Sequence, residues 1–146
     1  MVRTVNDSVA IANRLRPALL RIARHLRREV HSLGVTGGQV TLLVAIQKRP
    51  GVTAAELAEQ ERISAPAMST HLGRLEAARL IRREREGADR RRVGLYLTPE
   101  GDRVLRSVKK KRTAWLAARL RRLSEEDQAA VEAALPALER LLEEDE

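Results

Sequence analysis

Apolar residues recur at helical spacing near the start of the chain. A stripe with intervals of three or four positions, separated by arginines, is typical of an amphipathic helix. The stripe consists of Val9, Ala12, Leu15, Leu19, Ile22 and Leu26. It predicts a long helix over residues 6–32, with Pro17 inside it. Because proline removes one backbone hydrogen bond, we expect either a kink or a helix in two parts there.

A second helix with a clear start and stop is expected next. Thr36 precedes Gln39 by three positions, which is the spacing of a capping box. In that motif each of the two side chains bonds the backbone amide of the other residue. The pair predicts a helix over residues 37–48, which stops before Pro50-Gly51.

Two further helix starts follow closely. Thr53 and Glu56 repeat the capping-box spacing and predict a short helix over residues 53–60. Ser64 is placed to cap a third helix, which has a proline in its first turn and runs to about Arg79. Two short helices joined by a tight turn predict a helix-turn-helix.

Alternation replaces the helical spacing beyond this point. Residues 80–86 and 91–97 have the pattern of strands, with Val93, Leu95 and Leu97 on one face. The glycine-containing segment between the two strands predicts a β-hairpin.

Two more capped helices are expected after the hairpin. Thr98 is placed to start a helix over about residues 99–122, and Ser124 is placed to start another over residues 125–143. Together the elements predict a mainly α fold. It consists of a winged helix-turn-helix with a two-stranded β wing, flanked by long N- and C-terminal helices.

Charge is distributed unevenly along the chain. The net charge is +8, but residues 71–98 carry about +4, residues 99–123 about +7 and residues 124–146 about −8. A basic middle beside an acidic end suggests an anionic partner for one surface only. Charge alone does not distinguish DNA from RNA or an anionic membrane, and many of these side chains could simply be solvated helix faces.

Composition disfavours several classes of protein. The chain has no cysteine, which removes disulfides, thiolate metal sites and thiol redox sensing. Its three histidines show no tight ligand spacing, so we expect neither a metal nor a cofactor. Without a phosphate loop, a catalytic carboxylate pair or a nucleophilic triad, an enzyme is not expected. The lack of a signal core and of a long apolar run predicts a cytoplasmic protein with no membrane partner.

The third predicted helix has two contrasting faces. Met68, Leu72 and Leu75 are spaced as i, i+4 and i+7 and predict its buried side. The opposite side carries small residues, a hydroxyl and one arginine, namely Pro66, Thr70, Gly73, Arg74 and Ala77, with Ser69 on its flank. Small side chains let a helix approach the major groove, hydroxyls bond phosphates or base edges, and arginine reaches guanine or phosphate. An ordinary amphipathic helix with a small outer face is the alternative.

Arginines cluster on and around the predicted hairpin. They are Arg82, Arg83, Arg85, Arg90, Arg91 and Arg92, partly offset by Glu84, Glu86 and Asp89. A narrow ribbon tipped with arginines can enter the minor groove, where the potential is most negative. Because this hairpin directly follows a helix-turn-helix, the combination favours binding to duplex DNA.

Six short segments keep an order and spacing found in one known family. They are residues 35–40 (VTGGQV), 53–58 (TAAELA), 68–76 (MSTHLGRLE), 89–91 (DRR), 97–101 (LTPEG) and 123–127 (LSEED). With them the chain resembles, from Gly34 to Leu142, the MarR family of multiple-antibiotic-resistance-type transcriptional regulators. The resemblance implies a homodimer joined by the first and last helices. Residues 1–35 would be an N-terminal dimerisation helix, 36–98 the DNA-binding lobe and 99–146 the C-terminal helices that complete the dimerisation region.

The resemblance also implies roles for single residues. The family's Asp-x-Arg pair falls on Asp89 and Arg91, so that Arg91 would enter the minor groove and Asp89 would orient it or a neighbouring arginine. Ser69, Thr70 and Arg74 match positions that face DNA in the family. The full set of predicted DNA contacts is Ser64, Pro66, Ser69, Thr70, His71, Arg74, Arg83, Arg90, Arg91 and Arg92.

One position departs from the family's pattern. Arg79 stands where the family usually has a glycine, in front of the wing. Glycine would supply a left-handed helix end there. Arginine could adopt that conformation at a cost of about 1 kcal/mol, or the helix could end differently.

The sequence therefore predicts a dimeric DNA-binding transcriptional regulator, a repressor by expectation, that recognises a pseudo-palindromic duplex operator. Many members of the family bind small aromatic acids in a cleft between the dimer helices and the DNA-binding lobe. A small aromatic or lipophilic effector could therefore release the operator, although no ligand residue can be named. The alternative is a helical winged-helix interaction module that binds protein rather than DNA.

Overall fold

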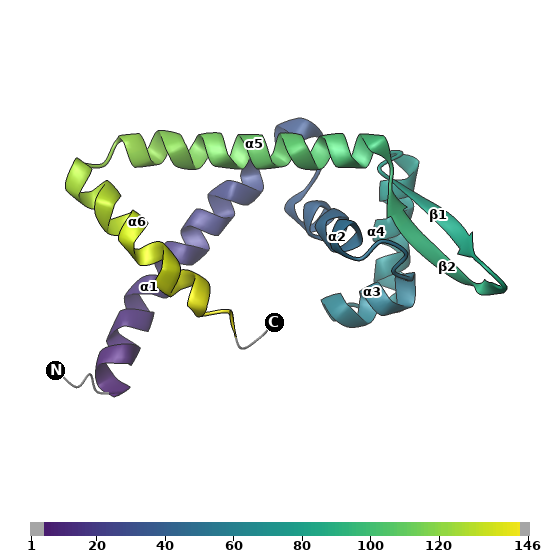
Figure 1. Ribbon diagram of the computed structural model, residues 1–146, viewed down its shortest axis with the longest axis horizontal. Helices are drawn as coiled ribbons and strands as arrows, with labels where there is room; N and C mark the ends of the chain where they lie inside the picture. Colours follow the sequence, from purple (N-terminus) through teal and green to yellow (C-terminus); the bar gives the residue numbers. More distant parts are fainter. Residues whose placement is uncertain (1–4, 144–146) are drawn as a thin grey trace. The chain divides into compact units, whose positions relative to one another are not determined.

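A computed structural model of the chain describes residues 5–143, apart from the side chains of Val5, Asn6 and Arg90. The fold is mainly helical, with one two-stranded antiparallel sheet (Figure 1). In chain order its elements are α1 (Val5–Arg28), the 3₁₀ turn η1 (His31–Leu33), α2 (Gly37–Lys48), α3 (Ala54–Glu61), α4 (Ala65–Ala77), β1 (Ile81–Glu86), β2 (Asp89–Leu97), α5 (Pro99–Arg121) and α6 (Glu125–Arg140). This is a winged helix-turn-helix with long terminal helices, as predicted. None of the described helices combines the length and apolarity that a membrane span requires.

The first helix is continuous but shorter than predicted. α1 runs through Pro17 as one helix of 24 residues, which excludes the helix in two parts, one of the two alternatives expected at this proline. It ends at Arg28, and the chain turns through η1 to Gly34, which has a left-handed φ of +80°. The turn places Val30 and Val35 in the core, where they are 0% and 5% exposed. Because burial of these two side chains is favourable, α1 ends at Arg28. The periodicity of its apolar residues does not reveal this end.

The next helices start at the predicted caps. The Thr36 Oγ1 accepts a hydrogen bond of 3.1 Å from the Gln39 amide, and the Gln39 side chain accepts one of 3.0 Å from the Thr36 amide. Thr53 and Ser64 likewise cap α3 and α4 through their hydroxyl oxygens. The second capping box is only half formed, because the Glu56 carboxylate instead accepts the Thr53 hydroxyl at 3.0 Å. That carboxylate is thereby oriented toward the wing.

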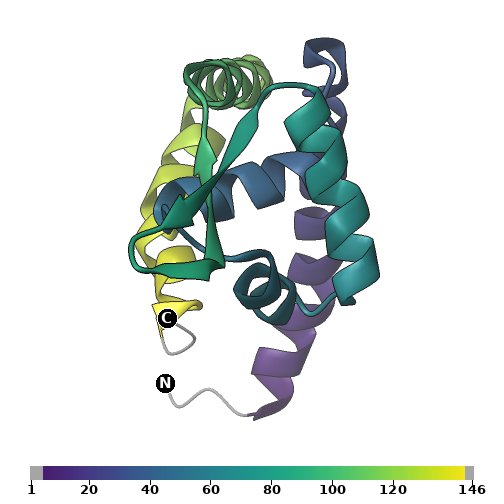
Figure 2. The ribbon, with the colours of Figure 1, turned by 90° about the vertical axis from the view of Figure 1, so that its right-hand side faces the viewer.

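Residues as far as Lys111 form one compact unit whose core is built on α2 and α4. Leu43 and Ile46 of α2 are fully buried. Met68, Leu72 and Leu75 of α4 are fully buried as well, which confirms the predicted inner face. In Figure 2 the two strands pass across the front of α2, with α4 at their side. α4 and the wing are thus held by the same core.

The start of α5 is fitted closely to the chain in front of the wing. The Thr98 hydroxyl donates to the Arg79 carbonyl at 2.6 Å and accepts from the Gly101 amide at 3.0 Å. A Cβ placed on Gly101 would lie only 2.2 Å from the Leu80 carbonyl oxygen. Because that oxygen belongs to the backbone, only glycine fits at this position.

Residues 112–143 belong to a second compact unit, formed by the end of α5 and by α6. Ser124 caps α6 through a hydrogen bond of 3.1 Å from the Asp127 amide, as predicted. No residue of α6 is buried within the described chain. Its apolar stripe faces solvent instead, with Val131 39%, Leu135 46% and Leu142 59% exposed.

Candidate nucleic-acid interface

The outer face of α4 has the character that a major-groove helix needs. All six residues predicted for it are exposed: Pro66, Ser69, Thr70, Gly73, Arg74 and Ala77. A Cβ placed on Gly73 would enter open space, so nothing in the described chain covers the middle of this face. The Thr70 hydroxyl donates to the Pro66 carbonyl at 3.1 Å, which leaves its oxygen able to accept a further bond. Ser64 is exposed, but its hydroxyl already caps the helix by accepting from the Ala67 amide at 3.2 Å.

Arg79 ends α4 in the way that the family's glycine would. Its φ is +63°, in the left-handed region. The Leu80 amide donates to the Leu75 carbonyl at 3.0 Å, and the Arg79 amide donates to the Glu76 carbonyl at 2.9 Å. These two bonds make a Schellman motif, which normally favours glycine.

The helix in front of the turn ends in the same conformation. Arg62 follows α3 with a φ of +54°. The Ile63 amide reaches back to the Ala58 carbonyl at 3.0 Å. Both helices of the helix-turn-helix therefore end on a left-handed arginine.

The wing differs from its prediction at the tip. Its second strand begins at Asp89 rather than at residue 91, so the turn consists of Gly87-Ala88, and Gly87 has a left-handed φ of +54°. Glu86 faces Asp89 while Arg85 faces Val93, so residues 90–92 have no partner in the register of β1. Such a bulge re-aims side chains at the edge of a sheet. The register change could not be inferred from alternation, because the three arginines have no apolar partner to define a face.

Asp89 orients Arg91 through the backbone. The Asp89 Oδ1 accepts a hydrogen bond of 3.1 Å from the Arg91 amide. The side chain of Arg91 is exposed and forms no ion pair with an acidic group among the described residues. The side chain of Arg90, also predicted to contact DNA, lies outside the described residues.

Two of the predicted DNA-contacting arginines are engaged within the protein. The Arg83 Nε lies 2.6 Å from a carboxylate oxygen of Glu76, which links β1 to the end of α4. Arg92, in the bulge near the tip of the wing, makes a denser set of contacts. Its Nη1 lies 2.7 Å from the Glu56 carboxylate of α3, and its Nη2 donates to the Gly51 carbonyl at 3.3 Å.

The carboxylates around Arg92 were not predicted as part of the site. The hydrogen bond from the Arg92 guanidinium, followed by that from Thr53, lowers the pKa of Glu56 below its ordinary value of 4.5. Glu86 accepts the hydroxyl of Tyr96, and this bond raises the pKa of Tyr96 above its ordinary value. The contacts join residues up to 41 positions apart, so no local sequence signal points to them.

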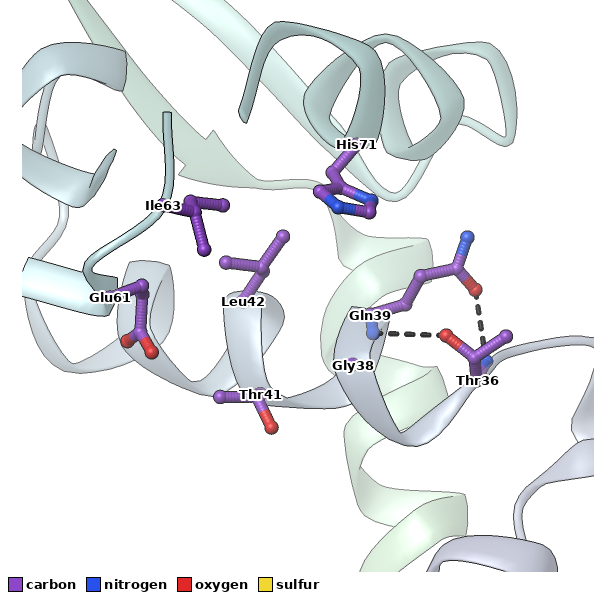
Figure 3. A pocket seen from close by; sticks show the side chains of 8 residues that line it. All are labelled: Thr36, Gly38, Gln39, Thr41, Leu42, Glu61, Ile63 and His71. Carbon is purple, nitrogen blue, oxygen red and sulfur yellow. Dashed lines mark hydrogen bonds between the residues drawn. The ribbon is translucent and has the colours of Figure 1, made fainter. Parts of the chain in front are cut away.

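His71 lies on the flank of α4 that faces α2. It is half-buried and lines a pocket of about 230 Å³, together with Thr36, Gly38, Gln39, Thr41, Leu42, Glu61 and Ile63 (Figure 3). This half-buried position fits packing, one of the two roles expected for His71, and its proximity to DNA stays a prediction. Within residues 5–143 no three histidine, aspartate or glutamate side chains gather in a way that could hold a metal ion.

Comparisons with known proteins agree with this geometry. Residues 33–92 match the family model of the MarR family. The HTH-type transcriptional repressor MdtR of Bacillus subtilis is 32% identical over 107 residues, which cover 73% of this chain and 69% of MdtR. A solved transcriptional regulator protein of Pseudomonas aeruginosa is 33% identical with a TM-score of 0.80, over 94% of this chain and 97% of that one. A mutant of Staphylococcus aureus MepR bound to an oligodeoxyribonucleotide shares the fold, with a TM-score of 0.71 and 22% identity over 90% of this chain and 97% of that one.

Proposed function

The chain belongs to the MarR family, whose members compared above are transcriptional regulators, and on that premise we propose that it is a homodimeric repressor that binds a pseudo-palindromic duplex operator. The observation that carries the proposal is the exposed outer face of α4, made of small and hydroxyl side chains, beside a wing that presents Arg91. The name of MdtR as a repressor supports the direction of regulation. The oligodeoxyribonucleotide bound to the MepR mutant supports the ligand.

Each protomer would contact DNA at two places. α4 would lie in the major groove, where Ser69 and Thr70 bond phosphates or base edges and Arg74 reaches guanine or phosphate. The open space above Gly73 would let the helix approach closely. Arg91 would enter the adjacent minor groove from the bulged tip of the wing.

Dimerisation would use the terminal helices. α1 exposes apolar side chains over much of its length, namely Val9, Ile11, Leu19, Leu20 and Ile22. α6 exposes its own stripe, and such apolar surface is a mark of an interface. On this assignment residues 1–35 and 99–146 join the protomers and residues 36–98 bind DNA. The two recognition helices would then lie about 34–36 Å apart, one helical turn of DNA.

Release of the operator would follow from a change in the separation of the two lobes. A small aromatic or lipophilic effector that binds better to a dimer with another separation would lower the affinity for DNA. The size of the effect equals the difference between its affinities for the two states.

The proposal is tested by DNA binding at several salt concentrations, after selection of bound sequences from random duplexes. The selected sites should contain inverted half-sites one helical turn apart, and log K should fall steeply with log salt concentration. Arg91→Ala should weaken binding and reduce the salt slope by about 1. Arg106→Ala, which removes the same charge from α5, is the matched control. Affinity that barely changes with salt would rule out DNA as the ligand.

A further inference from the structure

A group of charged residues ties the bulged end of the wing to the helix-turn-helix. We define it as the wing cluster, and it consists of Arg49, Glu56, Glu86 and Arg92. Resting on the proposed function, we propose that Arg92 is a positioning residue that fixes the direction of the wing and makes no contact with DNA. The cluster would thereby set the separation between Arg91 and the recognition helix.

The first argument is the number of acceptors around the Arg92 guanidinium. Its Nη1 lies 2.7 Å from a Glu56 oxygen, and its Nη2 donates to the Gly51 carbonyl at 3.3 Å. Its Nε lies 3.9 Å from a Glu86 oxygen. Two of its three nitrogens thus donate to acceptors in the protein, and the third lies at ion-pair distance from Glu86. Moving the guanidinium to a phosphate would give up these contacts, and the bond to Glu56 is charge-assisted on both sides.

The second argument is that the acceptors are themselves held in place. Glu56 is fixed by the Thr53 hydroxyl at 3.0 Å and by Arg49 at 2.5 Å. Glu86 accepts the hydroxyl of Tyr96. Since a Cβ at Gly94 would lie 2.6 Å from a Glu86 oxygen, the missing side chain at this position makes room for the carboxylate. The cluster is therefore a built arrangement and not a chance meeting of flexible side chains.

The third argument concerns the mechanics of the wing. Its backbone meets the segment before α3 at a single bridge. There the Gly51 amide donates to the Leu95 carbonyl and the Leu95 amide donates to the Val52 carbonyl, each at 2.9 Å. The Arg83–Glu76 ion pair of 2.6 Å ties β1 to α4. Arg92 lies three residues nearer the tip than Leu95 and ties β2 to α3, so that the wing is attached to both helices of the helix-turn-helix and its direction is fixed.

The proposal predicts an effect opposite in sign to that of simple electrostatics. Glu56 is an anion on a surface expected to meet DNA, and its loss would free two arginines. Long-range attraction alone would then strengthen binding. If the cluster positions the wing, Glu56→Gln should instead weaken binding to the selected operator by about three- to tenfold, the size expected for a few partly exposed charge-assisted bonds. Glu59→Gln removes the same charge from α3 outside the cluster and should not weaken binding.

A second pair of variants separates positioning from contact. Arg92→Lys keeps the charge but replaces the planar, forked guanidinium with a compact ammonium, which cannot reach Glu56 and Gly51 in the same geometry. A phosphate contact would tolerate lysine, whereas a positioning role predicts a loss close to that of Arg92→Ala. Neither variant should reduce the salt slope, while Arg91→Ala should reduce it by about 1. Without DNA, amide hydrogen exchange at Leu95 should be faster in Arg92→Ala than in the unaltered chain.

The outcomes separate the two proposals. If the unaltered chain shows no salt-dependent binding to duplex DNA, the proposed function fails and the positioning role fails with it. If the unaltered chain binds but Arg92→Ala lowers the salt slope, or Arg92→Lys binds normally, Arg92 is a DNA contact and only the positioning role is overturned. Tighter binding by Glu56→Gln, or unchanged exchange at Leu95 in Arg92→Ala, would overturn it as well.

Discussion

Residues as far as Lys111 bury a continuous apolar core, whereas no described residue of 112–143 is buried within the chain. Both regions contain regularly spaced apolar residues, but they differ in whether these residues are buried within the chain. Leu43 of α2 is fully buried among its neighbours, while Leu135 of α6 is 46% exposed. The first region is thus stabilised by contacts within one chain. The second carries apolar surface whose burial requires a partner, and substitutions in the two regions should differ in kind.

The largest expected effect is in the core of the first region. Leu43→Ala should lower the free energy of unfolding by about 2–5 kcal/mol, because the removed atoms leave a cavity that closes only in part. Denaturation by urea measures the loss, which should be the same at two protein concentrations. A loss well below 1 kcal/mol would mean that α2 is not the centre of the core.

Glycines within the first region should respond in opposite directions. Gly101→Ala should lower the free energy of unfolding by about 2–3 kcal/mol, because its Cβ would lie 2.2 Å from the Leu80 carbonyl oxygen. Gly73→Ala is the matched change in open space on a helix and should stabilise the fold by about 0.5–1 kcal/mol. Thermal unfolding of both variants measures the two changes in stability. Equal shifts would contradict the close contact at Gly101.

A smaller effect of another kind is expected in the second region. Leu135→Ala should barely alter the stability of the protomer but weaken the dimer by about 1 kcal/mol for each copy of the residue. Sedimentation equilibrium measures the dissociation constant. Arg140→Ala, on the opposite face of α6, is the control and should leave that constant unchanged. An unchanged constant for Leu135→Ala would place the interface elsewhere.

The smallest effect concerns the wing cluster and depends on pH. Because the folded state lowers the pKa of Glu56, its carboxylate contributes stability that is complete above the ordinary value of 4.5. That stability is lost as the pH falls through the lowered pKa. Glu56→Gln should therefore unfold more easily than the unaltered chain at pH 7, and the difference should disappear in acid. Urea unfolding of both proteins across this pH range tests the prediction. A difference in the free energy of unfolding that grows in acid would contradict it.

Local signals in the sequence were sufficient to predict most of the fold. The hydroxyl caps at Thr36, Thr53, Ser64 and Ser124 each start the predicted helix, because a cap and its amide lie within three residues. The inner face of α4 was likewise predictable from spacing alone. The early end of α1 was not, because the burial of Val30 depends on packing rather than on spacing.

Less of the candidate site than of the fold could be predicted from the sequence. The outer face of α4 follows from helical geometry, but arginine clusters do not reveal which guanidinium groups have partners in the fold. Arg91 and Arg92 are neighbours of the same type, and among residues 5–143 only Arg92 meets carboxylates, on α3 and β1. Such contacts between distant segments depend on the register of the wing, which the bulge at its tip changes.

At the two left-handed arginines that end α3 and α4, the positive charge of the side chain and the thermal stability of the fold favour different residues. Glycine would adopt the conformation of Arg62 or Arg79 with a gain of about 1 kcal/mol, but each replacement would remove a cation from the lobe. If the proposed DNA binding uses these cations, each replacement would raise thermal stability and lower the affinity for DNA. The chain has arginine at both positions, so a more thermostable variant could be obtained there without altering a single buried side chain.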